Sequence, residues 1–482
     1  MKHRHAFILP IILLAFCLNA QEREETYVPE TDPLVLAKLD TWQDYKLGLM
    51  MTWGTYSQWG IVESWSLCGE DEGWCQRRGP HAVDYDGYKR AYVDLKKTFN
   101  PVKFDPERWA EAARDAGMKY VIFTTKHHDG FCMFDTKTTD YKITSPQCPF
   151  HAHSRPDVTK EIFDAFRKKG IMIGAYYSKP DWNTADYWWP YFPTPDRHVN
   201  YDPAKYPERW QRFKDFTYAQ IEELMSRYGL VDILWLDGAW VRPFENMPKE
   251  FESWATKGSY NQDIDMARIT AMARRHQPGL IVVDRWVSGP FENYLTPEQK
   301  VPERALRVPW ESCITMATSW SYVKSDRYKP TRQLIHLLVD VVAKGGNLLL
   351  NIGPSPEGEW VPDAYERLKG MGEWLTVNGE AIYGTRPIAP YKEGKVCLTQ
   401  KKNGGAVYAI YLADEGESSP PQQIRLANVQ PAEGADIVML GVPGDLEWRK
   451  EGKGMCVEIP DRVRKQPPCG NAWAIRISRI WE

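Results

Sequence analysis

The sequence predicts an α/β protein in two parts, a (β/α)8-like TIM barrel followed by a C-terminal antiparallel β-sandwich domain. From residue 30 to residue 387, short apolar runs alternate with amphipathic stretches, which is the pattern of parallel strands joined by helices. From residue 388 to residue 482, short alternating runs are separated by Gly- and Pro-rich turns, which is typical of antiparallel strands. The length of 482 residues suits a barrel with one smaller domain.

Each predicted barrel strand follows a predicted helix. The predicted strands are residues 120–124, 171–177, 231–236, 280–283 and 348–352. The predicted helices that precede them are residues 106–117, 159–170, 207–229, 264–277 and 330–344. Strands that alternate with helices form a parallel sheet, and a long series of such units indicates a barrel.

Residues 1–21 have the features of a secretory signal peptide. A basic start, with Lys2 and Arg4, precedes an apolar run over residues 6–18, and Ala20 is a small residue suited to cleavage. We expect export, with the mature protein periplasmic or secreted. A lipoprotein anchored at Cys17 ranks second because the bulky Phe16 precedes the cysteine. The run is too short for a membrane span, and no other stretch reaches that length.

The composition is that of a globular protein, with 43% hydrophobic and 26% charged residues. With a net charge of -3, the chain has no excess of positive charge with which to bind nucleic acid or an anionic membrane. The 21 Trp residues fit either large cores or the stacking of sugar rings. No cysteine and histidine cluster has the spacing of a zinc site, so we expect neither a metal nor a cofactor.

Two carboxylates are candidates for catalysis. Asp237 directly follows the predicted strand 231–236, and barrel enzymes carry functional residues at the C-terminal ends of their strands. An aspartate at this point can also cap the next helix. Glu298 lies in a Pro-containing loop, where a carboxylate is ordinarily a solvated charge. It is a candidate for catalysis only as a partner for Asp237. Such a pair, surrounded by Trp, His and Arg, fits glycoside hydrolysis.

His127 and His128 follow the predicted strand 120–124. Adjacent side chains in a strand point to opposite faces, which makes a shared metal ion awkward. Two interpretations remain open. The two histidines recognise sugar hydroxyl groups, or they have a structural role in a loop.

Several motifs together resemble glycoside hydrolase family 29, the α-L-fucosidases, over residues 34–389. They are Trp53-Gly54-Thr55-Tyr56-Ser57, Lys126-His127-His128-Asp129-Gly130-Phe131, Trp235-Leu236-Asp237-Gly238, Asp284-Arg285-Trp286, Tyr294-Leu295-Thr296-Pro297-Glu298, Trp310-Glu311, Ser319-Trp320-Ser321-Tyr322 and Gly346-Asn347-Leu348-Leu349-Leu350-Asn351-Ile352-Gly353-Pro354. Each motif is weak alone, but their shared order and spacing are specific.

The resemblance implies a retaining exo-glycosidase that acts on fucosylated oligosaccharides or glycoconjugates and needs no cofactor. Asp237 matches the position of the family's nucleophile, and Glu298 matches that of the acid/base in many members. Glu311 and Glu292 are alternatives for the acid/base because this residue sits in a variable loop. The residues that match substrate-binding positions are His127, His128, Trp235, Arg285, Trp320, Glu63, Trp65 and Trp53.

One position departs from the family pattern. Thr52 stands where the family usually has a histidine that contacts a sugar hydroxyl. This departure keeps open an α-L-galactosidase or a fucosidase restricted to branched glycans. A non-catalytic sugar-binding protein on the same scaffold and a metal-dependent hydrolase that uses His127 and His128 are further alternatives. Linkage, oligomeric state and disulfide pairing stay undetermined.

Overall fold

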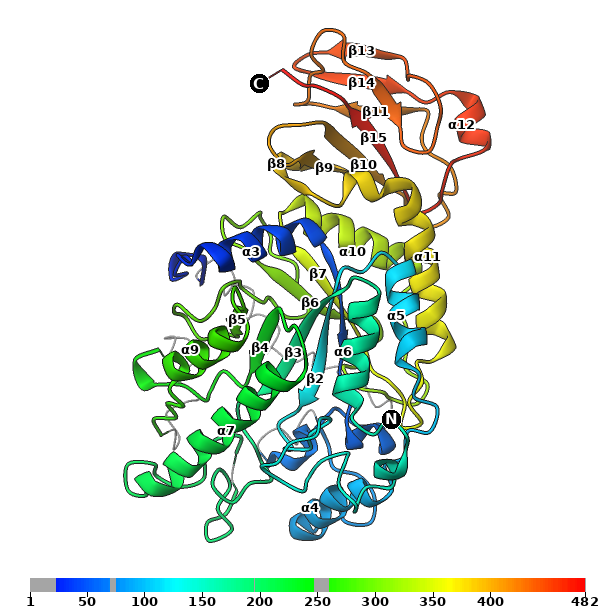
Figure 1. Cartoon of the computed structure of the whole chain (residues 1–482). Helices are drawn as coiled ribbons and strands as arrows, with labels where there is room; N and C mark the ends of the chain where they lie inside the picture. The colour runs from blue at the N-terminus through cyan, green and yellow to red at the C-terminus, as the bar shows by residue number, and fades with distance from the viewer. Residues whose placement is uncertain (1–22, 70–74, 195, 247–259, 482) are drawn as a thin grey trace, which may run out of the picture.

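The computed structural model describes residues 23–69, 75–194, 196–246 and 260–481 (Figure 1). A barrel-like domain forms the larger part, and a smaller β-domain packs against one end of it. The predicted signal peptide lies outside the described residues. Within those residues, no helix is both long enough and apolar enough to cross a membrane.

Seven parallel strands form the curved sheet of the large domain, in the order β5-β4-β3-β2-β1-β7-β6. Their bounds are β1 Leu47–Met51, β2 Tyr120–Lys126, β3 Met172–Ser178, β4 Ile233–Asp237, β5 Ile281–Asp284, β6 Glu311–Thr315 and β7 Asn347–Ile352. The fold class is TIM-like, as predicted, and the described residues form seven regular strands of the barrel in place of eight.

An irregular segment, residues 292–299, lies between the two edge strands β5 and β6. Asn293 N donates to Val282 O at 2.9 Å on the β5 side. On the other side, Glu311 N donates to Leu295 O at 2.8 Å, and Glu298 forms a bridge with Cys313 of β6. This segment therefore closes the ring and carries Glu298.

Helices surround the sheet (Figure 1). Their bounds are α3 Pro33–Tyr45, α4 Tyr85–Val93, α5 Pro106–Asp115, α6 Val158–Lys168, α7 Pro207–Arg227, α9 Met266–His276, α10 Thr331–Ala343 and α11 Pro362–Asn378. Aspartates at the N-caps of α3, α5, α6 and α9 accept backbone N–H groups, which explains where these helices begin. Helix α3 covers the N-terminal end of the barrel, where Trp42 stacks on Tyr294 with ring centroids 4.1 Å apart.

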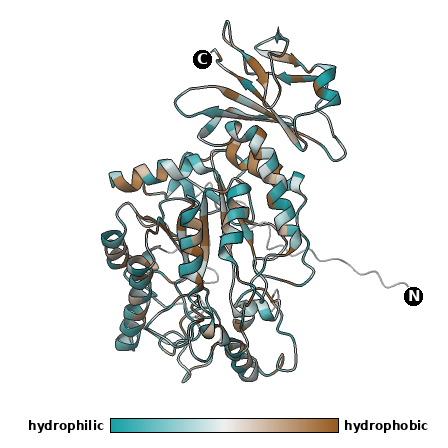
Figure 2. Cartoon of the chain, turned by 45° about the vertical axis from the view of Figure 1, so that its right-hand side comes forward, coloured by the Kyte–Doolittle hydropathy of each residue, from teal (hydrophilic) through white to brown (hydrophobic). Residues whose placement is uncertain are grey.

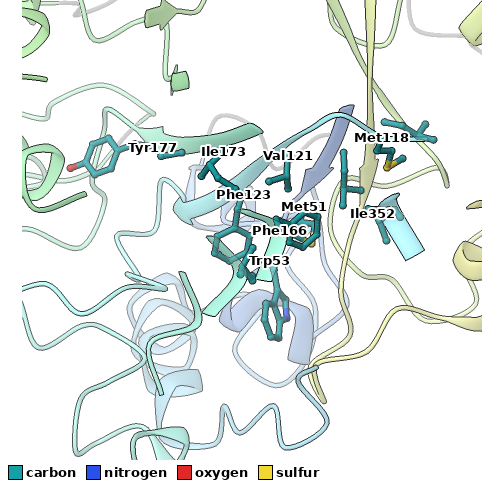
Figure 3. Close-up of a cluster of buried hydrophobic side chains, with 14 of the residues drawn as sticks. Met51, Trp53, Met118, Val121, Phe123, Phe166, Ile173, Tyr177 and Ile352 are labelled. Carbon is teal, nitrogen blue, oxygen red and sulfur yellow. The ribbon is translucent and has the colours of Figure 1, made fainter. Parts of the chain in front are cut away.

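The strands separate two apolar cores because successive side chains point to opposite faces. Outward side chains such as Met51, Phe123 and Ile173 pack beneath the helices (Figure 3). Inward side chains, such as Ile233 and Trp235 of β4, fill the barrel. The central strands are correspondingly brown in Figure 2. This alternation turns Asp237 inward as well, two residues beyond Trp235.

The small domain is a two-sheet β-sandwich. One sheet has the order β12-β15-β10-β9-β8 and the other β11-β14-β13. The bounds are β8 Thr385–Glu393, β9 Val396–Lys401, β10 Val407–Leu412, β11 Gln423–Leu426, β12 Ile437–Met439, β13 Trp448–Glu451, β14 Gly454–Glu458 and β15 Ala472–Ile477, with the short helix α12 Asp461–Lys465. Arg386 and Lys402 form ion pairs with Asp40 and Asp44 of α3. The sandwich therefore sits at the N-terminal end of the barrel, and the C-terminal ends of the strands point away from it.

Strand β6 was not among the predicted strands. Its sequence contains Glu311, Ser312 and Thr315, which are too polar to read as a buried strand. All three are buried. The burial of Glu311 is explained by its hydrogen bonds inside the barrel. Its carboxylate accepts from Tyr120 OH at 2.6 Å and from Trp235 Nε1 at 3.2 Å.

Candidate active site

Asp237 ends β4 at the mouth of the barrel. Its Oδ1 accepts from Arg285 Nη1 at 3.0 Å, and its Oδ2 accepts from Tyr176 OH at 2.8 Å. The next residue, Gly238, has φ +92°, and a Cβ there would lie 2.3 Å from Pro180 Cδ. Only glycine fits this turn, which fixes the direction in which the chain leaves Asp237.

Asp237 is ionised. Burial by itself raises the pKa of this carboxyl, but the positive charge of Arg285 and a hydrogen bond from the Gly238 N–H oppose the rise and hold the pKa well below its usual range. The side chain remains 20% exposed, so a ligand can reach it.

Arg285 joins the two candidate catalytic carboxylates. Its Nη1 donates to Asp237, and its Nη2 donates to Glu298 Oε2. The guanidinium is 8% exposed, whereas Glu298 is 38% exposed and faces the mouth. A guanidinium presents its donors in a rigid fork, so the two carboxylates lie close together.

His127 and His128 lie on the same side of the mouth, with ring centroids 4.3 Å apart. The expectation that they point to opposite faces is wrong, because β2 ends at Lys126 and both residues lie in the turn after it. His127 Nδ1 hydrogen-bonds with Ser64 Oγ. Among the residues that the structure describes, neither ring nitrogen of His128 has a hydrogen-bond partner, and its Nε2 lies 3.8 Å from Asp237 Oδ2.

Both imidazoles are neutral near pH 7. Burial lowers the pKa of His127 to about 4 and lowers the pKa of His128 well below its usual value. A neutral imidazole offers one donor and one acceptor, which is the combination that a sugar hydroxyl group requires.

Three indole rings surround His128. The ring centroids of Trp65, Trp182 and Trp240 lie 4.9, 5.1 and 5.2 Å from that of the histidine. The guanidinium of Arg197 lies over Trp65 at 5.0 Å. The mouth therefore has a wall of aromatic faces beside its carboxylates.

Glu63 contributes a third carboxyl group. It is 2% exposed, and its Oε1 accepts from Ser321 N at 2.9 Å. Burial raises the pKa of Glu63 to about 8, and the negative charges of Glu298 and Asp237 add to the rise, while the Ser321 N–H opposes it. Glu63 is therefore protonated near pH 7 and can donate a hydrogen bond.

This site geometry has counterparts among known proteins. A family model described as alpha-L-fucosidase matches residues 14–380, and one for the alpha-L-fucosidase C-terminal domain matches residues 391–478. This chain belongs to the α-L-fucosidase family. The α-L-fucosidase of Branchiostoma floridae is 29% identical, with 98% of this chain and 99% of the relative covered. Human tissue α-L-fucosidase is 28% identical, with 100% and 99% covered.

Solved α-L-fucosidase structures share the fold. α-L-fucosidase isoenzyme 1 from Paenibacillus thiaminolyticus superposes with a TM-score of 0.72 at 28% identity, covering 93% of this chain and 100% of that one. The Thermotoga maritima α-fucosidase, solved in complex with fucose, gives a TM-score of 0.68 at 26% identity, covering 95% of this chain and 99% of that one.

Thr52, the departure from the family pattern, is already engaged in a hydrogen bond. Its Oγ1 donates to Asn351 Oδ1 at 2.8 Å, and Asn351 Nδ2 donates to Trp320 O at 2.6 Å. Thr52 is 4% exposed. In this α-L-fucosidase, the short side chain therefore anchors the backbone of the loop that carries Trp320.

Three of the predicted residues lie apart from the carboxylate pair. Trp53 is 1% exposed and lies in the outer core (Figure 3). Its ring packs there against those of Phe99, Phe104 and Trp109. Glu311 lies inside the barrel beneath Trp235, whose ring lies 5.0 Å from the Arg285 guanidinium. Glu292 is 3% exposed and forms an ion pair with Arg23.

Sequence reasoning missed five residues of the site, which are Ser64, Tyr176, Trp182, Arg197 and Trp240. Tyr176 was detectable, because it lies near the end of a predicted strand and an inward position there faces the mouth. Trp240 closely follows Asp237 in the sequence. The positions of Ser64 and Arg197 depend on long loops, for which the sequence carries no comparable signal.

One group of side chains has the composition of a metal site. Within the described part of the chain, ligand atoms of His127, His128 and Asp237 lie within 4.8 Å of one another. Neutral imidazoles and a carboxylate are ligands that zinc accepts. The same three groups are equally suited to bind the hydroxyl groups of a sugar.

Proposed function

We propose that this α-L-fucosidase releases terminal L-fucose from fucosylated glycans by a retaining double displacement. Asp237 is the nucleophile and Glu298 is the acid/base. The observation that carries this assignment is the single Arg285 guanidinium that contacts both carboxylates at the barrel mouth. This proximity supports the separation of about 5–5.5 Å that retaining enzymes use, against about 6.5–9.5 Å in inverting enzymes.

In the first step, an Asp237 oxygen attacks the anomeric carbon, and the bond from that carbon to the leaving oxygen breaks. Glu298, which takes up a proton when the substrate replaces its contact with Arg285, gives this proton to the leaving oxygen, and a fucosyl ester of Asp237 remains. In the second step, Glu298 takes a proton from water, the water oxygen attacks the anomeric carbon, and the Asp237 carboxylate is released. Two inversions at the same carbon retain its configuration.

The surrounding groups suit this chemistry. Asp237 needs to be ionised to attack, and Arg285 favours that state. Neutral His127 and His128 bind hydroxyl groups without adding positive charge beside an oxocarbenium-like transition state. Because Glu298 is the more exposed carboxylate, an incoming glycosidic oxygen can replace its contact with Arg285.

Kinetics with p-nitrophenyl α-L-fucoside test the reaction and the two roles. Asp237→Ala should lower kcat/KM by roughly 10⁴-fold or more, as loss of a nucleophile does. Glu298→Ala should lower kcat by about 10²–10⁴-fold, because hydrolysis of the fucosyl ester loses its base, with partial rescue by azide. A 2-deoxy-2-fluoro fucosyl fluoride should label Asp237, as located by peptide mass spectrometry. A label on another residue, or full activity of either variant, would contradict the assignment.

Substrate range is tested in the same assay. We expect α-L-fucoside to be cleaved in preference to α-L-galactoside, with β-D-fucoside inert. Faster cleavage of the galactoside would favour the alternative that Thr52 raised. Fucose binding measured by calorimetry, together with no turnover of aryl or natural fucosides, would favour a sugar-binding protein.

Treatment with a chelator distinguishes hydrolysis by the two carboxylates from a metal-dependent reaction. After dialysis against EDTA, we expect at least nine-tenths of the activity to remain, because the proposed steps use only protein groups. Activity that is lost and then restored by Zn²⁺ would instead assign a metal to the group formed by His127, His128 and Asp237.

We also propose that the chain is exported and cleaved near residue 21, on the basis of its basic start, its apolar run and Ala20. Mass spectrometry of the protein from a cell that expresses the full sequence tests this proposal. A mature N-terminus at or near residue 21 would support it. An intact N-terminus would contradict it, and a lipid on Cys17 would indicate a lipoprotein.

A further inference from the structure

The segment just after the predicted signal peptide contacts the chain that carries the catalytic groups. We call residues 23–30 the N-terminal strap. Tyr27 OH donates to Asn293 O at 2.9 Å, and Glu30 Oε2 accepts from Asn293 Nδ2 at 3.0 Å. Glu24 accepts from Arg307 N at 2.5 Å. The strap therefore contacts the chain on both sides of Glu298 in the sequence.

Arg23 makes the most buried of these contacts. It is 7% exposed and forms an ion pair with Glu292, which is 3% exposed. Its guanidinium also lies 5.0 Å from the ring centroid of Trp286. Burial raises the pKa of Glu292 to about 7, and the charge of Arg23 opposes that rise. Removing Arg23 would leave a buried carboxyl without its cation, which is a costly state.

Glu292 in turn holds the backbone next to Arg285. Its Oε1 accepts from Trp286 N at 3.0 Å. Trp286 has φ +63°, a left-handed conformation that a tryptophan adopts only when its surroundings impose it. The residue before this turn is Arg285, whose guanidinium contacts both Asp237 and Glu298.

We propose that Arg23 and Glu292 are positioning residues that act through the backbone of Trp286 to hold Arg285 between the catalytic carboxylates. Arg23 binds Glu292, Glu292 holds the Trp286 N–H, and the fixed turn aims the Arg285 side chain. The N-terminal strap is thus part of the catalytic apparatus, although it touches neither carboxylate. This inference rests on the roles proposed above for Asp237 and Glu298.

The test compares Arg23→Ala with Arg304→Ala in the otherwise complete chain. Arg304 also binds the strap, through Glu24 at 2.7 Å, but it lies outside the connection to Arg285. We expect Arg23→Ala to lower kcat at least tenfold with KM within about twofold, and Arg304→Ala to leave both near wild type. Arg23→Lys, which restores a cation, should recover part of the lost kcat.

Two further measurements separate positioning from general instability. Melting temperatures establish that each variant is folded at the assay temperature. If Arg23→Ala is not folded, Glu292→Gln decides, because it keeps an acceptor for Trp286 N and removes the ion pair. In the double variant of Arg23→Ala and Glu292→Gln, kcat should fall no further than in the more impaired single variant.

Wild-type kcat in folded Arg23→Ala, equal losses in Arg23→Ala and Arg304→Ala, or additive losses in the double variant would overturn the proposal. An iminocyclitol of fucose configuration supplies a readout without turnover, because its ammonium binds ionised Asp237. Its Kd should rise at least fivefold in Arg23→Ala and stay unchanged in Arg304→Ala. If the wild-type enzyme turns over no fucoside, the proposed function is contradicted instead. The iminocyclitol Kd values of Arg23→Ala and Arg304→Ala then decide whether Arg23 positions Arg285.

Discussion

At the scale of single residues, the chemistry of the site depends on which of its buried groups carry a charge. Arg285 is the cation between two carboxylates, and it favours the ionised form of Asp237. Glu63, only 2% exposed and next to the same carboxylates, is protonated instead. Two acidic side chains at one mouth thus take different protonation states, because Arg285 stabilises the charge of Asp237 whereas burial raises the pKa of Glu63.

The protonated state of Glu63 predicts a pH effect on activity. Its pKa is about 8, so above that pH it adds a buried negative charge beside Glu298 and Asp237. We expect kcat/KM to fall above about pH 8 and the fall to move to higher pH in Glu63→Gln. The exposed Glu303→Gln is the control and should keep the wild-type profile. An unchanged profile in Glu63→Gln would assign the alkaline fall to another group.

Thr52 predicts an effect on both stability and substrate binding. Thr52→Val removes the donor to the buried Asn351 Oδ1, which should lower the free energy of unfolding by about 1–3 kcal/mol. The loop that carries Trp320 loses its anchor, so KM should rise. Thr52→Ser keeps the hydroxyl group and should behave like wild type. Denaturant unfolding and steady-state kinetics measure the two effects, and a Thr52→Val protein with unchanged stability would refute the prediction.

At the scale of elements, the turn after β2 shows how a strand end becomes a binding surface. Lys126 and Asp181 form an ion pair beneath the turn, with side chains 0% and 2% exposed. The Asp181 carboxylate lies so close to Gly130, φ +82°, that a Cβ there would be 2.4 Å from its Oδ1. Trp182 N also donates to His128 O at 2.7 Å. These contacts hold both histidines at the mouth.

The buried pair predicts that Lys126→Met is strongly destabilising. It leaves the Asp181 carboxylate without its cation and should cost about 3–5 kcal/mol. Lys103 pairs with Glu359 at the surface, and Lys103→Met should change stability little. Urea unfolding of both variants measures the difference. Equal stabilities would mean that water or a shifted side chain compensates Asp181.

At the scale of the whole molecule, the β-sandwich lies at one end of the barrel (Figure 1). The site lies at the other end, where Asp237 ends β4. The sandwich is held to α3 by ion pairs and to α11 by the hydrogen bond from Trp374 Nε1 to Ala472 O at 2.9 Å. It therefore covers the N-terminal end of the barrel and does not cover the mouth.

Buried titratable groups predict how stability varies with pH. Glu63, Glu292 and Glu311 have folded-state pKa values of about 8, 7 and 7, against 4.5 ordinarily. Because these values are raised, the groups' stabilising contribution is complete below about pH 4.5 and is lost as the pH rises toward 8. His127 and His198 have pKa values of about 4, so their contribution is present above pH 6.5 and is lost as the pH falls toward 4.

Above pH 6.5 the carboxyl contribution continues to fall. Buried Lys46 opposes this fall, because burial lowers the pKa of its ammonium to about 7 and its contribution to stability grows from about pH 7 upward. Since three carboxyls act against one ammonium, we expect the melting temperature to be lower at pH 8.5 than at pH 6.5, in calorimetry at constant ionic strength. Glu311→Gln should make this dependence shallower. A melting temperature that rises from pH 6.5 to 8.5 would show that other groups dominate.

The sequence alone was sufficient for the fold class, for five of the seven barrel strands and for the family. The observed strands β2, β3, β4, β5 and β7 lie within a few residues of the predicted ones, because buried parallel strands are continuous apolar runs. The motif around Asp237 could be placed at the barrel mouth for the same reason, since a residue that follows such a run lies at the C-terminal end of its strand.

Only the tertiary structure decided which side chains meet. Arg285 contacts Asp237 at the end of another strand and Glu298 in the irregular segment 292–299. The closure of the ring by that segment involves no regular strand. Trp53 belongs to the outer core and Glu311 to the barrel interior, although both stand in family motifs. Local sequence patterns record which residues are apolar along one element. Whether a polar residue faces the mouth, the interior or the N-terminal strap depends on partners from other elements, and these are brought together only by folding.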